Sequence, residues 1–338
     1  MKIFKCSIIG YGYMGEIRRK TIQSNNVTEL VAIYDKNLIG KEDGLFKKSL
    51  TEAITSEVDI VFVCTPNKFI PEIVSFSLDK GKHVFCEKPP GRCLNDIVEM
   101  KKAEKRNPNC KLMFGFNHRY HPGILKAKSI VESGQLGNVL NMRGLYGKSG
   151  GVDFKDSWRN NFEYSGGGIL LDQGIHMIDL FHFFGGKFRD VKSHLSNLHW
   201  LFEVEDNAVV ILKNDKNQLA TLHSSSTFWR HTFQLSITLD NGYLSIDGLL
   251  SKTGSYGRET LTIGKRKFEN ESDAVGNPSE EIIYFDKDNS WDLELDNLIN
   301  CIDSDVKVSK SSSEDAYSVM EVIEKCYKDS MLEIYSEK

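Results

Sequence analysis

The sequence predicts an α/β protein in two parts, a doubly wound, mainly parallel sheet followed by an α+β domain with an open, mainly antiparallel sheet. A buried-strand pattern over residues 3–9 runs directly into a glycine-rich turn and a helical segment. Further apolar strand patterns at 29–35, 59–65 and 82–87 alternate with helical ones, as in β-α-β units. Beyond about residue 122 the pattern changes to short alternating segments, which are typical of antiparallel strands.

Length and composition limit the class of protein. The chain has 338 residues, which favours two domains over one. A net charge of −4 gives no electrostatic reason to expect nucleic acid or an anionic membrane as partner. The seven cysteines are scattered and form no CxxC pair, as in a reduced, cytoplasmic protein. We see no signal-peptide pattern and no apolar run near the ~20 residues of a membrane span.

The turn after the first strand, GYGYMG, carries the spacing of a dinucleotide-binding Rossmann fingerprint. By itself such a turn is also an ordinary structural turn, but strand, helix and a later acidic residue follow in the required order. The pyrophosphate is expected at the helix N-terminus, where free N–H groups and the helix dipole favour an anion. We expect the cofactor to contact the whole turn, Gly10, Tyr11, Gly12, Tyr13, Met14 and Gly15.

The end of the second strand predicts which dinucleotide binds. Asp35 lies 20 residues beyond Gly15, where a carboxylate accepts hydrogen bonds from the adenosine ribose and repels a 2′-phosphate. NAD is therefore favoured over NADP. Lys36 is the counter-argument, because a lysine there tolerates NADP, but we prefer to interpret it as a solvated turn residue. Only residues 36–57 separate this strand from the next, so we expect a short helix near 50–55 and an open adenosine end.

The fourth strand ends in Glu87-Lys88-Pro89-Pro90, at the edge of the sheet where ligands bind in doubly wound folds. The two prolines fix the backbone and remove two amide donors. Most lysines are solvated and carry no function. A lysine held at this position is a candidate for contact with substrate.

Residues 166–179, GGGILLDQGIHMID, are expected to form a helix after three glycines. Asp172 and His176 are four residues apart, so a helix places them one above the other, with Asp179 on a nearby face. The apolar side of this helix consists of Leu171, Ile175 and Ile178. The alternative is an ordinary amphipathic helix in which His176 belongs to the core.

The second half of the chain predicts a sheet and two closing helices. Strands are expected at residues 139–146, 191–199, 207–212, 219–226, 233–247, 259–268 and 281–285. Asn241-Gly242 signals a two-residue hairpin turn. We place a Rossmann NAD-binding domain at 1–121 and a substrate-binding and oligomerisation domain at 122–338. Its final helices, about 290–303 and 313–335, would pack back onto the first domain.

Four segments in order carry a resemblance to a known family. GYGYMG, CEKPPG at 86–91, GFNHRYHP at 115–122, and WRNN with GGGILLDQGIHMID between 158 and 179 resemble the Gfo/Idh/MocA family of sugar and cyclitol oxidoreductases. The resemblance covers nearly the whole chain. It implies hydride transfer between NAD(P) and a secondary alcohol carbon, and a C-terminal sheet that forms one wall of the site and often an oligomer interface.

The resemblance also implies roles for single residues. His176, with an unperturbed pKa of about 6.5, would serve as general base or acid, and Lys88 would stabilise charge on the same substrate oxygen. Asp172 would bind a neighbouring hydroxyl or orient His176. Further cofactor positions are Thr65, Pro66, Asn67, Glu87 and Lys88, and further substrate positions are Asn117, Arg119, Tyr120, Trp158 and Arg159. For the arginines the alternative is a surface ion pair, and Trp158 is alternatively a core residue.

Two features depart from the family pattern or from a simple interpretation. Ile70 stands where many relatives carry a histidine, which should change packing around the cofactor more than the chemistry. His118 and His121 suggest a metal, but they form no recognised ligand spacing with another His or Cys, and HExxH is absent. We therefore expect no metal.

Three functions remain open at this point. The first is an NAD-dependent dehydrogenase of a sugar, cyclitol or nucleotide-linked sugar. The second is a redox-neutral enzyme that uses tightly held NAD transiently, as glycosidase members of the family do. The third is a non-catalytic NAD-sensing regulator, which the presence of Lys88, Asp172 and His176 argues against. A broad sheet face that needs covering predicts a homodimer or homotetramer through the C-terminal sheet.

Overall fold

The computed structural model describes residues 2–38, 43–150, 155–266 and 278–334. The chain divides into two compact units. The first unit consists of Met1–Asn117, Asn161–Gly166 and Trp291–Glu321, and the second of His118–Asn160, Gly167–Ser290 and Val322–Lys338. Each unit is built around one sheet, as the sequence predicts.

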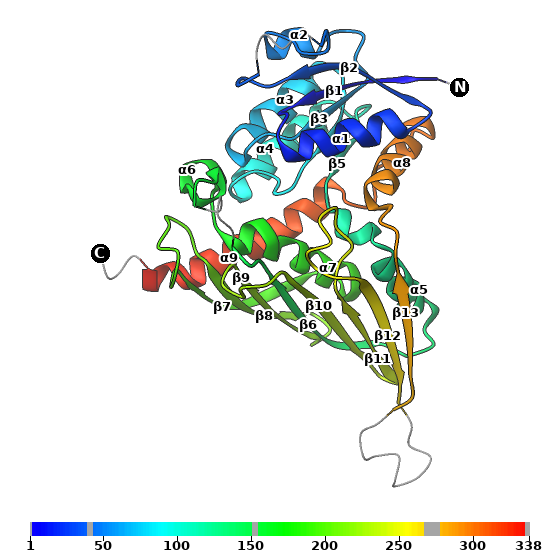
Figure 1. Ribbon diagram of the computed structural model, residues 1–338, viewed down its shortest axis with the longest axis vertical. Coiled ribbons are helices and arrows are strands. Elements are labelled where there is room, and N and C mark those ends of the chain that lie inside the picture. The colour runs from blue at the N-terminus through cyan, green and yellow to red at the C-terminus, as the bar shows by residue number, and fades with distance from the viewer. Residues whose placement is uncertain (1, 39–42, 151–154, 267–277, 335–338) are drawn as a thin grey trace. The chain divides into compact units, whose positions relative to one another are not determined.

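The first unit contains a five-stranded parallel sheet in the order β2-β1-β3-β4-β5, drawn in blue to cyan in Figure 1. Its strands are β1 (Phe4–Ile9), β2 (Thr28–Tyr34), β3 (Ile60–Val63), β4 (His83–Cys86) and β5 (Leu112–Phe114). The strand order reverses between β1 and β3. In doubly wound sheets, ligands bind at the carboxyl ends of strands beside such a reversal.

The described helices that connect these strands are α1 (Tyr13–Ser24), α2 (Leu50–Ala53), α3 (Ile70–Asp79) and α4 (Leu94–Arg106), with the 3-10 turn η1 (Asn67–Phe69) before α3. The helix α8 (Ser290–Asp303) comes from much later in the chain, and its residues from Trp291 on belong to the same unit. α1 packs on β1 and β2, and α3 packs on β3, β4 and α4. Within the described residues of the crossover from β2 to β3, the only helix is the four-residue α2, which confirms the short helix predicted there.

The second unit contains an eight-stranded sheet in the order β13-β12-β11-β10-β6-β9-β8-β7. Only the β6–β9 pair is parallel among the described strands. The strands are β6 (Val139–Gly147), β7 (Phe188–Ser196), β8 (Asn207–Asn214), β9 (Leu219–Ser225), β10 (Thr232–Leu239), β11 (Gly242–Asp247), β12 (Glu259–Lys265) and β13 (Glu280–Phe285). The mainly antiparallel sheet predicted from the alternating segments is confirmed.

The two faces of this sheet differ. On one face, α7 (Ile175–Gly185) packs on β6, β7 and β9, and α5 (Pro122–Ser133) packs on β11 and β12. The inward side chains of β8, for example Val210 and Leu212, are fully buried there. The opposite face, which we call the open face, exposes Val209, Ile211, Leu219, Ile282 and Tyr284, each to between 44% and 54%. The last of the described helices is α9 (Ser313–Ile334).

The predicted hairpin exists, but its turn residues differ from the prediction. β10 and β11 pair Leu239 with Gly242, so the two loop residues are Asp240 and Asn241. Gly242 already belongs to the strand. A Cβ on Gly242 would collide with the Gly264 carbonyl oxygen, so this glycine serves close approach of β12 and not the turn.

Candidate active site

The glycine turn of the first unit fits a pyrophosphate. Gly10 has a φ of +91°, and a Cβ there would lie 2.7 Å from the Cys64 carbonyl carbon. A Cβ on Gly15 would collide with the Gly10 carbonyl oxygen. Gly12, the N-cap of α1, has open space where its Cβ would stand. Protein therefore fills the space beside Gly10 and Gly15, whereas the backbone at Gly12 is accessible beside the helix N-terminus, as an anion requires.

Asp35 is fastened to this turn. Its carboxylate accepts hydrogen bonds from the Tyr11 N–H at 2.8 Å and from the Asn37 N–H at 2.9 Å. The ammonium group of Lys36 lies 4.9 Å from the centre of the Phe69 ring. A cation held over a ring is attracted by the ring's negative face. The acidic residue is thus fixed at the turn, while the neighbouring lysine is held at Phe69.

The end of β3 supplies the other predicted cofactor positions. The Thr65 hydroxyl is buried and has no hydrogen-bond partner within the described ranges, so a bound group can satisfy it. The Asn67 side chain donates to the Ser165 carbonyl at 2.7 Å, and Lys68 pairs with Glu163. Residues 161–166 are therefore attached to the loop that follows β3.

Glu87 and Lys88 have different surroundings at the end of β4. Glu87 is buried, and its carboxylate accepts from the Arg18 guanidinium at 2.6 Å. Lys88 is half-buried and lies between two buried residues, Glu87 and Pro89. The Glu87 side chain thus belongs to the interior of the first unit, and its predicted role at the cofactor would fall to its backbone.

The segment that carries Asp172 and His176 is not one regular α-helix. Leu170–Gly174 forms a π-helical turn (η5), and α7 begins only at Ile175. A π turn contains an extra residue, so the four-residue spacing does not give the α-helical stacking we expected. This corrects the sequence prediction for the helix, while the assignment of both residues to the site stays a prediction.

Asp172 lies between two cations of the second unit. Its carboxylate is 2.5 Å from the Lys148 ammonium and 3.3 Å from the Arg159 guanidinium. The Arg159 guanidinium in turn lies 4.6 Å from the centre of the Trp158 ring. Arg159 is therefore an ion-pair partner of a predicted site residue, and Lys148 is a member of the group that sequence analysis missed.

His176 is buried and stacks on His118, with ring centres 3.8 Å apart and planes 14° from parallel. His118 Nε2 lies 2.9 Å from the Tyr146 hydroxyl oxygen, which is also hydrogen-bonded to Tyr256. Burial raises the pKa of both phenols above the ordinary value. The His176 ring is thus positioned by a chain of aromatic polar groups.

A buried glutamate anchors the start of this segment. The Glu205 carboxylate accepts from the N–H groups of Gly168 and Leu170 at 2.9 and 3.0 Å, and from the Tyr327 hydroxyl at 2.9 Å. A Cβ on Gly168 would collide with the Glu205 carbonyl oxygen, and one on Gly167 with the Tyr327 hydroxyl. These two glycines are needed for close packing within the protein. Burial raises the pKa of Glu205, and the hydrogen bonds it accepts lower it in part.

Most of the other predicted substrate positions are buried. Arg119 forms a bidentate ion pair with Asp179, with Nε 2.8 Å from Oδ2 and Nη2 2.6 Å from Oδ1, and both residues are buried. It is therefore not a surface pair. Asn117 and Tyr120 are also buried, whereas Trp158 lies in the 3-10 turn η4 (Trp158–Asn160) and is half-buried. The described part of the chain holds no group of three or more His, Cys, Asp or Glu side chains suited to a metal ion.

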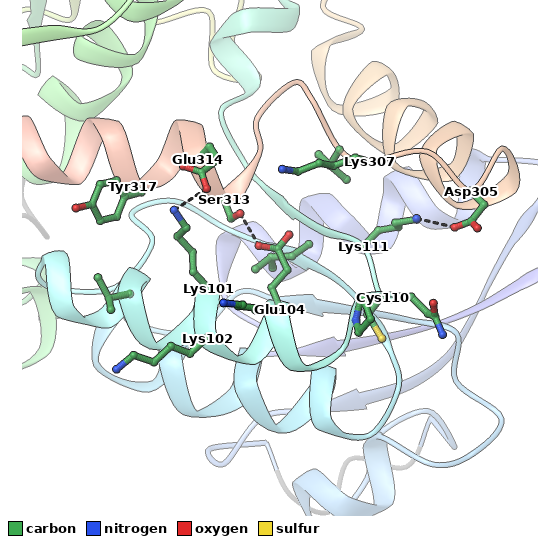
Figure 2. A pocket seen from close by; sticks show the side chains of 16 residues that line it. Lys101, Lys102, Glu104, Cys110, Lys111, Asp305, Lys307, Ser313, Glu314 and Tyr317 are labelled. Carbon is green, nitrogen blue, oxygen red and sulfur yellow. Dashed lines mark hydrogen bonds and ion pairs between the residues drawn. The ribbon is translucent and has the colours of Figure 1, made fainter.

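A cavity of about 890 Å³ in the first unit contains none of these residues (Figure 2). It is lined by α4, the start of β5, the chain after α8, and the start of α9. Lys101 pairs with Glu314 and Lys111 with Asp305, each at 2.7 Å. These two lysines are paired with carboxylates of the protein, and the lining contains none of the predicted site residues, so we assign the cavity no role.

Two family models match the chain. One, described as oxidoreductase family, NAD-binding Rossmann fold, matches residues 4–116. The other, described as GFO/IDH/MocA C-terminal domain, matches residues 124–245. Together they cover the sheet of the first unit and most of the sheet of the second.

The chain is similar to proteins named as enzymes that act on sugars or sugar derivatives. Levoglucosan dehydrogenase of Pseudarthrobacter phenanthrenivorans is 34% identical over 149 residues, which are 44% of this chain and 37% of that protein. The 2,7-anhydro-N-acetylneuraminate hydratase of Escherichia coli is 27% identical over 253 residues, 71% of this chain and 66% of that protein. The matched stretches thus span about a third to two thirds of these relatives. The crystal structure of aldose-aldose oxidoreductase from Caulobacter crescentus has a TM-score of 0.82 at 23% identity and covers 98% of both chains.

The fold and the glycine turn define a protein with an NAD-binding Rossmann domain and a second domain of α+β type. Since both family models describe the same group of proteins, the chain belongs to the Gfo/Idh/MocA oxidoreductase family, as the sequence motifs predict. Within the described ranges, no helix combines the length and apolar character that a bilayer crossing requires.

Proposed function

We propose that the chain is an NAD-dependent dehydrogenase or reductase that acts on a secondary hydroxyl or carbonyl group of a sugar, cyclitol or nucleotide-linked sugar. The observation that carries the proposal is the match of both parts of the chain to one oxidoreductase family. The open backbone at Gly12 supports the cofactor, and the carboxylate of Asp35 favours NAD over NADP. The dehydrogenase name of the levoglucosan relative supports a sugar-like substrate.

Each catalytic candidate has a separate task. The nicotinamide, when bound, would accept the hydride that leaves the alcohol carbon during oxidation. His176 would accept the hydroxyl proton, so that a carbonyl remains, and would return the proton in the reverse direction. Lys88 would donate a hydrogen bond to the same oxygen and stabilise its developing charge. Asp172, held by Lys148 and Arg159, would accept a hydrogen bond from a neighbouring hydroxyl.

We also propose that the chain forms a homodimer or homotetramer through the open face. Val209, Ile211 and Leu219 are large apolar side chains that this face exposes. Contiguous exposed apolar groups favour association between protein surfaces. Size-exclusion chromatography with light scattering tests this proposal, and a monomeric mass at micromolar concentration would contradict it.

A redox-neutral enzyme that uses NAD transiently is the second candidate. It is favoured by the match to a relative named as a hydratase, which covers 71% of this chain. One experiment separates the candidates: absorbance at 340 nm and product analysis with NAD and a panel of anhydro sugars, sugar phosphates, inositols and nucleotide-linked sugars. Steady NADH formation supports the dehydrogenase, and conversion without net NADH supports the redox-neutral enzyme. NAD binding with no conversion of any compound would contradict both enzyme functions and would favour a non-catalytic NAD-sensing regulator.

A further inference from the structure

We propose that Arg18 and Glu294 are positioning residues for Lys88. Together with Glu87 they form a buried group of three charges, which we call the Arg18 triad, and Lys88 follows Glu87 directly in the chain. The proposal rests on the function proposed for Lys88 above. It adds two residues that contact neither substrate nor cofactor and act through the end of β4.

Two ion pairs and two aromatic rings define the geometry of the Arg18 triad. The Arg18 side chain, from α1, is fully buried, with Nε 2.6 Å from Glu87 Oε1 and Nη2 2.7 Å from Glu294 Oε2. The guanidinium carbon lies 4.1 Å from the Phe85 ring centre and 4.8 Å from that of Trp291. Both carboxylates and both rings thus fix the plane of the guanidinium, which leaves it little rotational freedom.

Glu87 is held from its other side as well. A Cβ on Gly115, just beyond β5, would lie 2.8 Å from Glu87 Oε2, so the carboxylate packs directly against the chain that follows β5. The Glu87 side chain is therefore wedged between Arg18 and Gly115. A change in the direction of the Arg18 guanidinium would disturb the Glu87 side chain, and through it the chain from which Lys88 extends.

Stability alone gives a weak reason for such a group. Buried ions lose their hydration, and well-packed apolar residues of similar volume often give a more stable protein. The Arg18 triad joins three elements: α1, which begins at the cofactor turn, the end of β4, and α8. It therefore connects the helix at the pyrophosphate position with the strand end that precedes Lys88, and Arg18 pairs with Glu87, the residue directly before Lys88.

The test compares Glu294→Gln and Arg18→Lys with Lys20→Gln. Lys20 is an exposed residue of α1, paired with Glu16, and serves as control. We expect both triad variants to lower kcat by about 10- to 100-fold, because small displacements of a catalytic group have effects of this size. KM and the Kd for NAD should change by no more than about twofold, since the cofactor turn is intact. Lys20→Gln should match the wild type.

A second readout follows Lys88 directly and needs no substrate. Reductive ¹³C-methylation labels lysine amines for NMR, and Lys88→Arg identifies the Lys88 signal. We expect that signal to shift or broaden in both triad variants and to stay unchanged in Lys20→Gln. If the wild type converts no sugar, the proposed function fails, while this signal still tests the Arg18 triad.

A third variant separates positioning from folding. The neutral set Arg18→Met, Glu87→Gln and Glu294→Gln removes all three charges at similar volume and should fold even if single variants do not. We expect a melting temperature near that of the wild type but a low kcat. Wild-type kcat in the neutral set, or an unchanged Lys88 signal in both single variants, would overturn the proposal and leave the Arg18 triad a purely structural feature.

Discussion

The glycine turn of the first unit, residues 10–15, where we place the cofactor, and the surroundings of His176 in the second unit are built in different ways. The turn is made of backbone, and its groups come from one stretch of chain between Gly10 and Asp35. The His176 ring lies beside the side chains of His118 and Tyr146, and Tyr146 in turn contacts Tyr256. A backbone site depends on glycine and on local conformation, whereas a side-chain site depends on single polar atoms. The first arrangement suits a shared cofactor, and the second suits variable substrates.

The largest effects are expected for the two residues proposed to act on the substrate oxygen. Lys88→Ala and His176→Ala should each lower kcat by about 100- to 10,000-fold, the range of general acid–base catalysis. NAD affinity should remain nearly unchanged, because neither side chain belongs to the backbone turn. Steady-state kinetics and fluorescence titration with NADH provide the measurements. Equal loss of NAD binding in both variants would place these residues on the cofactor side.

Two glycines of the turn should respond in different ways to the same added methyl group. Gly10→Ala forces a left-handed backbone and a collision with Cys64, so it should lower the free energy of unfolding by about 2 kcal/mol or more. The methyl group of Gly12→Ala meets no protein atom, so this variant should have the same free energy of unfolding as the wild type. Its methyl group would occupy the pyrophosphate position and raise the Kd for NAD by about tenfold or more. Thermal unfolding and NADH titration test the pair, and a Gly12→Ala protein with unchanged NAD affinity would contradict the location of the cofactor.

Asp35 tests whether the turn also selects the dinucleotide. Asp35→Asn removes a negative charge that would face a 2′-phosphate, so the ratio of the Kd values for NADP and NAD should fall by about tenfold. The Asn side chain can still accept from the Tyr11 N–H, and it loses the hydrogen bond from the Asn37 N–H to the second oxygen. Titration with both dinucleotides gives the ratio. A ratio that does not change would mean that Asp35 does not face the ribose.

The smallest effect is expected for the hydroxyl behind the stacked histidines. Tyr146→Phe removes the hydrogen bond to His118 and should lower kcat by about three- to tenfold, the value of one hydrogen bond. Tyr243→Phe is the matched control, since its hydroxyl bonds to Glu280 on the exposed part of the sheet. The stacking of His118 on His176 should persist in both variants. Equal kcat in the two variants would show that the hydrogen bond between Tyr146 and His118 has no part in the reaction.

The first unit was predictable because its signals are local. Strand periodicity, the spacing of Gly10, Gly12 and Gly15, and the short connection before β3 each depend on neighbours in the chain, and the structure reproduces all of them. The alternation that predicts the second sheet is equally local. Contacts of the individual site residues with NAD and with a sugar stay predictions.

Long-range contacts account for what the sequence did not predict. The Asn241-Gly242 pattern predicts a turn at Gly242, whereas this residue lies in β11. Its contact with Gly264 involves another strand, which the local sequence does not reveal. The π turn before α7 coincides with hydrogen bonds to Glu205, which lies 35 residues away from Leu170 in the chain. Lys148, Tyr146 and Tyr256 carry no local motif, so only the fold identifies them as neighbours of Asp172 and His118.

The most direct test is a crystal structure with NADH and a sugar that the enzyme converts. We expect the Lys88 Nζ atom and one ring nitrogen of His176 to lie within about 3.2 Å of the same substrate oxygen, above the nicotinamide carbon that carries the hydride. A bound sugar whose reacting oxygen contacts neither side chain, or a dinucleotide that avoids the turn at Gly12, would contradict the account.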